Sequence, residues 1–182
     1  ILEQLRSANP TQSYTIQGQK ANHNTRDTCI LEDQYGYILH HRVMEGETDE
    51  AIAVAMVEET QVRFPGLKQC SFDEGFYTPA NQADLRRLLA VSVLPQKGRL
   101  SPEEEAFESS EVFVAARRQH AAVESAINAL EVHGLDRCPD HGLDGFKRYV
   151  ALAVLARNLQ QLGARLKKKK VRVATRCRGK AA

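Results

Sequence analysis

The sequence lacks any apolar run that could cross a membrane, because no stretch of 18 residues is free of charged side chains. It begins Ile1-Leu2-Glu3-Gln4, without an initiator methionine and without the basic-then-apolar leader of a secreted protein. We therefore expect a cytoplasmic protein with no membrane partner, and this start is also compatible with a fragment of a longer protein.

Cysteine is scarce, and no two cysteines form a Cys-x-x-Cys pair. The four are Cys29, Cys70, Cys138 and Cys177. In a chain of this size the pattern indicates reduced thiols rather than a disulfide framework. A zinc site is also disfavoured, because the one cluster of possible zinc ligands does not have the spacing of a known zinc finger or zinc ribbon. These are His133, Cys138 and His141.

Acidic residues are absent after Asp144, and the C-terminal end is strongly basic. The whole chain has a net charge of +2, and nine Lys and Arg residues follow Gly163, so residues 1–162 carry a formal −7. With 42% apolar residues the chain is not expected to be disordered. The tail is either an electrostatic contact for nucleic-acid phosphates or a solvated terminus with no specific role.

Hydropathy patterns predict strands that alternate with helices. Two short β-type runs around a Gly-containing turn indicate an antiparallel hairpin, and Ser101-Pro102-Glu103-Glu104 is a strong helix start. The expected strands are 28–31, 37–44, 67–72 and 91–95, and residues 14–16 give only a hint of another. The expected helices are 48–64, 81–89, 101–134 (interrupted near 109–110) and 144–162. This order predicts an α/β fold with a mixed sheet flanked by helices.

Two carboxylates, Asp73 and Glu124, are candidate active-site residues of such a fold. Asp73 follows a buried strand directly, at the sheet edge where active groups gather. Glu124 lies within a helix and shares one face with Arg117, His120 and Asn128, although a face of this kind can also be merely solvated. Converging Asp and Glu oxygens suit Mg²⁺ (or Mn²⁺), and two such ions support phosphoryl transfer on DNA.

Several segments, in order, resemble the C-terminal half of a bacterial insertion-sequence transposase of the DDE class. They cover about four-fifths of the chain and are 30–44, 70–79, 94–100, 115–128, 134–137 and 145–150. The resemblance implies an RNase-H-like catalytic core over residues 18–163, with 1–17 unassigned and 164–182 a basic tail. It also implies DNA transposition, with metal-dependent strand cleavage and strand transfer on transposon ends and target DNA. The family's activity further implies a homo-oligomer assembled on DNA and association with the bacterial nucleoid.

By position, the resemblance implies that Asp73 and Glu124 are the catalytic, metal-binding residues. It also implies that Arg117 and Arg118 bind DNA phosphates. The lysines expected to contact DNA from the tail are Lys167, Lys168, Lys169 and Lys170. The family's first catalytic Asp should lie on the first core strand, but no Asp precedes Asp27. We therefore expect the first strand to be missing and the chain to be a truncated copy with weak or no activity.

Two other functions remain open on the sequence alone. A non-catalytic nucleic-acid-binding protein would act through the basic tail and the Arg117–Arg118 face. A metal-dependent phosphoesterase unrelated to mobile DNA would hydrolyse small phosphate esters without DNA. Replacing Asp73 distinguishes these functions, because DNA binding by the tail alone would not depend on that carboxylate.

Overall fold

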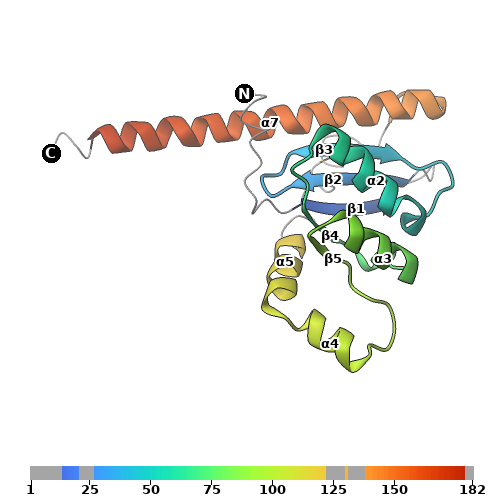
Figure 1. Cartoon of the computed structure of the whole chain (residues 1–182). Helices are drawn as coiled ribbons and strands as arrows, with labels where there is room; N and C mark the ends of the chain where they lie inside the picture. The colour runs from blue at the N-terminus through green and yellow to red at the C-terminus, as the bar shows by residue number, and fades with distance from the viewer. Residues whose placement is uncertain (1–13, 21–26, 122–129, 131–137, 179–182) are drawn as a thin grey trace.

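A computed structural model describes residues 14–20, 27–121, 130 and 138–178 (Figure 1). Its elements, in chain order, are β1 (Tyr14–Lys20), β2 (Asp27–Asp33), β3 (Ile38–Val43), α2 (Asp49–Arg63), β4 (Gln69–Phe72), the 3₁₀ helix η1 (Glu74–Phe76), α3 (Pro79–Leu88), β5 (Val91–Val93), α4 (Pro102–Glu108), α5 (Glu111–Ala121) and α7 (Gly142–Arg178). The predicted alternation of strands and helices is confirmed, with shifts of a few residues at the ends of most elements.

The predicted hairpin is formed by β2 and β3, which pair antiparallel. Its turn is closed by the Asp33 carboxylate, whose Oδ1 accepts hydrogen bonds of 2.9 Å from the backbone N–H groups of both Tyr35 and Tyr37. Gly36 adopts φ +80°, a conformation that a side chain would disfavour. Asp33 therefore serves the turn.

The expectation that the first core strand is missing is wrong. Tyr14–Lys20 forms β1, which lies at the centre of a five-stranded sheet of order β3-β2-β1-β4-β5. It pairs antiparallel with β2 along its full length and parallel with β4 from Tyr14 to Ile16. Only Ile16 marks the strand as apolar, and it is fully buried, so the polar composition of β1 concealed a central strand.

Helices cover both faces of this sheet, giving three layers (Figure 1). On one face α2 and α3 pack over β1, β2 and β4, and their shared core includes Ile16, Met56, Phe72 and Leu85. On the other face α7 covers β2 and β3, where Val150 and Val154 contact Ile30 and Ile38. The α5 helix packs against β4 and β5, with Phe113 against Val93.

The break expected near residues 109–110 separates α4 from α5. The predicted start of α4 is confirmed as a capping box between Ser101 and Glu104. The rest of the long helix expected up to Gly134 lies mostly outside the described residues.

The last helix is much longer than predicted, because the 144–162 pattern continues as helix to Arg178. Residues 164–178 of the expected separate tail therefore belong to α7, and residues 14–17 of the expected N-terminal remnant belong to β1. Among the described residues, no helix is both long and apolar enough to span a membrane.

Candidate active site

Asp73 lies directly after β4, as predicted, and begins the short η1 helix. Its side chain is half-buried, and its backbone C=O accepts a hydrogen bond from Phe76 N–H at 3.2 Å. The last residue of β1 that pairs with β4 is Ile16, so Gln17 and Gly18 lie beside the point where β4 ends. Asp73 is therefore at the carboxyl end of β4, beside the middle of the central strand β1.

A second carboxylate, Asp49, comes to the same place from α2. The β3 strand runs parallel to β1 and β4, since both β3 and β1 are antiparallel to β2, and Asp49 follows the carboxyl end of β3. A Cβ added to Gly75, two residues after Asp73, would lie only 3.1 Å from Asp49 Oδ2. The glycine thus leaves space that the Asp49 carboxylate occupies.

The charges of both carboxylates act on the buried Cys29 thiol. Cys29 lies on β2 opposite Gly18 of β1. Burial raises the pKa of Cys29 well above its usual value, and the negative charges of Asp49 and Asp73 raise this pKa further. The pKa of one buried thiol therefore responds to both Asp49 and Asp73, which approach the same end of the sheet.

The described residues do not complete the expected catalytic set of carboxylates. The β1 strand carries no acid, so the described first strand does not supply the first catalytic Asp. Glu124 lies outside the described residues. Within the described parts of the chain no group of three His, Cys, Asp or Glu side chains could hold a metal ion, and this covers Cys138 and His141 but not His133.

Arg117 and Arg118 are exposed on α5, which packs beside β4 and β5. Their exposure leaves both guanidinium groups accessible to a polyanion. Phe113 anchors the same helix to Val93 of the neighbouring β5 strand.

The four tail lysines are exposed as well, but they lie at the opposite end of the sheet from Asp73. Near its start, α7 is tied to the carboxyl end of β3 by an ion pair between Lys147 and Glu45. Further along, Arg165 stacks on the Tyr35 ring at 4.2 Å, beside the hairpin turn at the other end of the sheet. Lys167–Lys170 follow that contact, where α7 runs past the sheet (Figure 1). The structure therefore does not bring the lysine run to Asp73.

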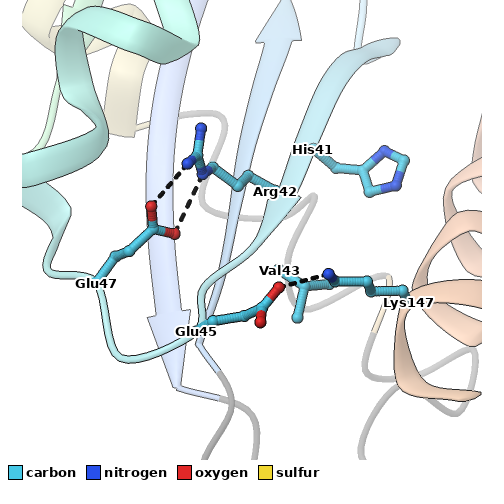
Figure 2. Close-up of a pocket in the computed structure, with 6 residues that line it drawn as sticks. All are labelled: His41, Arg42, Val43, Glu45, Glu47 and Lys147. Atoms are coloured by element: carbon cyan, nitrogen blue, oxygen red, sulfur yellow. Dashed lines mark hydrogen bonds and ion pairs between the residues drawn. The ribbon is translucent and has the colours of Figure 1, made fainter. Parts of the chain in front are cut away.

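A charged cavity of about 550 Å³ lies at the end of β3 and does not include Asp73 (Figure 2). Its lining residues are His41, Arg42, Val43, Glu45, Glu47 and Lys147. Arg42 makes two hydrogen bonds to Glu47, of 2.7 and 3.2 Å, and these bonds hold the pKa of Glu47 below its usual value. Since Lys147 also pairs with Glu45, the cavity is internally neutralised, and its charges favour no particular ligand.

The sequence offered little to identify Asp49. In a linear reading it is an acid in the first turn of a helix, where it suits the helix dipole. Only the parallel direction of β3 and β4, together with the glycine at position 75, brings it to Asp73. The available signal was an acid, Asp49, a few residues after the end of a predicted strand. This signal becomes informative only once the order of the strands in the sheet is known.

Comparison with known proteins gives distant similarities to solved structures and no match by sequence. No family model matches the chain, and no curated protein matches it. Among solved structures, the catalytic core domain of BIV integrase aligns with 76% of this chain and 93% of its own, at 14% sequence identity and a TM-score of 0.36.

Proposed function

We propose that this chain is a DNA-transposition protein of the DDE class, built to cleave and join DNA strands with divalent metal ions. The observation that carries the proposal is Asp73 at the carboxyl end of β4, beside the central strand of a sheet of order β3-β2-β1-β4-β5. An RNase-H-like core is expected to present its catalytic carboxylate at this position, as the resemblance of the sequence to insertion-sequence transposases implies.

Asp73 and Asp49 are the residues we propose to hold the metal, with Glu124 as the third carboxylate by resemblance. Carboxylate oxygens are the hard donors that Mg²⁺ and Mn²⁺ prefer, and Mg²⁺ usually keeps several waters, so few protein ligands suffice. Bound metal would supply an activated water and stabilise the leaving oxygen of the DNA strand. The donor types present fit this role.

The absence of an acid on β1 limits the activity we expect. A carboxylate set without its first Asp holds metal less tightly, so strand cleavage by this chain should be slow or undetectable with Mg²⁺ and easier to detect with Mn²⁺. Asp49 supports the site from α2, and it does not occupy the first-strand position that the resemblance implies.

The direct test is nicking of supercoiled plasmid DNA with Mn²⁺. The proposal predicts slow nicking that Asp73→Asn abolishes. Asp84→Asn is the matched control, because Asp84 is a partly exposed carboxylate on α3 that pairs with Arg87. Nicking that survives Asp73→Asn at the wild-type rate would refute the proposal, and hydrolysis of small phosphate esters without DNA would favour the phosphoesterase alternative.

The second candidate, a non-catalytic nucleic-acid-binding protein, is favoured by the exposure of the basic groups. Arg117, Arg118 and the lysines at 167–170 are all exposed, and their charges can neutralise phosphates without an active site. Tight DNA binding that depends steeply on salt, combined with no nicking by the wild type at any Mn²⁺ concentration, would support this candidate instead.

A further inference from the structure

The α7 helix presents a second apolar stripe on the side turned away from the sheet. Its buried residues, among them Val150, Ala153 and Val154, pack on β2 and β3. The exposed stripe consists of Leu152 (62% exposed), Leu155 (55%), Leu159 (58%) and Leu166 (48%). Covering these leucines with a partner would be favourable, because burial removes their apolar surface from water.

The spacing of the stripe is that of a coiled-coil seam. Leu152, Leu155, Leu159 and Leu166 follow one another at intervals of three, four and seven residues, and the half-exposed Leu162 fills the missing position. Such a repeat keeps one apolar line facing a partner helix. The positions that flank the seam include Ala156 and Gly163, small residues that allow a close approach.

Gly163 is an unusual residue within a long helix, where glycine costs about 1 kcal/mol relative to alanine. Apart from its own stretch of helix, no atom of the described residues lies within 4 Å of the point where its Cβ would be. The chain therefore does not need glycine there for its own packing. A neighbouring helix in close contact would need it.

The uneven charge of the chain indicates which partner binds the leucine stripe and how the partner helix is oriented. The part of α7 beyond the hairpin carries the run Lys167–Lys170 and extends past the sheet (Figure 1). A short helical segment of like charges without neighbours is only marginally stable. Residues 1–162 carry a formal −7, since the nine basic residues after Gly163 outweigh the net +2. The acidic body of a second copy is therefore complementary to this basic helix end.

We propose that the leucine stripe of α7 is a homodimer interface in which two copies of α7 pair antiparallel, centred near Leu159. In this arrangement the basic end of each helix lies beside the start of the other α7, where Asp140 and Asp144 are exposed, and the partner's Leu155 falls opposite Gly163. A parallel pair would instead place the two lysine runs side by side. The proposal does not depend on the catalytic function proposed above.

The size of the interface is sufficient for a specific dimer. An antiparallel pair centred at Leu159 overlaps over about 50 Å, at 1.5 Å per residue. A stripe about 10–13 Å wide then buries roughly 1,000–1,300 Å² in total, at the lower end of specific interfaces. The sheet packs against the other side of α7, so each body lies clear of the seam. We expect the dimer to form at micromolar concentrations.

The first test is the oligomeric state of the full chain by sedimentation velocity. Wild type should be dimeric, and Leu159→Glu should weaken dimerisation by about 100-fold or more, because the change occurs in both subunits. Val62→Glu is the control, because Val62 is an apolar residue on α2 that is 83% exposed. A wild type that stays monomeric at about 100 μM, or a dimer that Leu159→Glu leaves intact, would overturn the proposal.

Orientation is tested by disulfide crosslinking in chains whose Cys138 and Cys177 are replaced by serine. Leu152→Cys chains are mixed with Leu166→Cys chains that carry a size tag. The antiparallel pair predicts crosslinks between the two kinds of chain. Crosslinks only between chains of the same kind would show a parallel pair and contradict the charge argument.

Discussion

Glu32 is a buried carboxylate whose titration should control the stability of the protein near neutral pH. It lies on β2 beneath α7 and is only 4% exposed. Its Oε2 has no hydrogen-bond partner among the described residues. Burial raises the pKa of Glu32 from 4.5 to about 7, the positive charge of Arg157 opposes this rise, and the charge of Asp33 adds to it.

The sign and size of the effect follow from this pKa. Because the folded protein binds the Glu32 proton more tightly than the unfolded chain does, the contribution of Glu32 to stability is greatest at acid pH and is lost as pH rises from about 4.5 to 7. A rise of about 2.5 pKa units implies a loss of about 2.5 kcal/mol between pH 5 and pH 8. Glu32→Gln preserves the shape of the side chain and removes this loss.

The measurement is urea unfolding followed by circular dichroism at pH 5 and pH 8. Relative to wild type, Glu32→Gln should gain about 2.5 kcal/mol at pH 8 compared with pH 5. Glu58→Gln, a change at an exposed residue of α2, is the control and should keep the wild-type pH profile. Parallel pH profiles for wild type and Glu32→Gln would refute the assignment.

Two further predictions concern α7. Asn158 binds both backbone groups of Ile38 on the edge strand β3, accepting from its N–H and donating to its C=O, each at 2.9 Å. Asn158→Ala should therefore cost about 1–3 kcal/mol in urea unfolding, whereas the exposed Lys168→Ala should cost little, and equal losses would contradict this role. Replacing Lys167–Lys170 by glutamine should lower the salt slope of DNA binding by about 3–4, measured by fluorescence anisotropy. An unchanged slope would show that these lysines do not contact phosphates.

The sequence predicted best those elements whose patterns are local. The β2–β3 hairpin, the α4 capping box and the place of Asp73 after β4 each depend on a few neighbouring residues, and each agrees with the structure. Turn and cap chemistry acts within a handful of residues, so a linear reading captures it.

Features that depend on tertiary pairing were not predictable in this way. The polar β1 strand shows little strand pattern and owes its place to β2 and β4 on either side. The extension of α7 to Arg178 escaped prediction because the apolar periodicity weakens in the lysine run. Asp49 approaches Asp73 only because three strands run parallel, which no spacing along the chain reveals.

Binding of Mn²⁺ is the measurement that tests the central claim most directly, because the account requires Asp73 and Asp49 to share one divalent cation. Free Mn²⁺ is quantified by electron paramagnetic resonance with wild type, Asp73→Asn, Asp49→Asn, the double variant and the Asp84→Asn control. The account predicts that each single change at Asp73 or Asp49 weakens binding about tenfold or more, and that the double change adds less than the sum of the two. Wild-type affinity in Asp49→Asn and Asp73→Asn would contradict it.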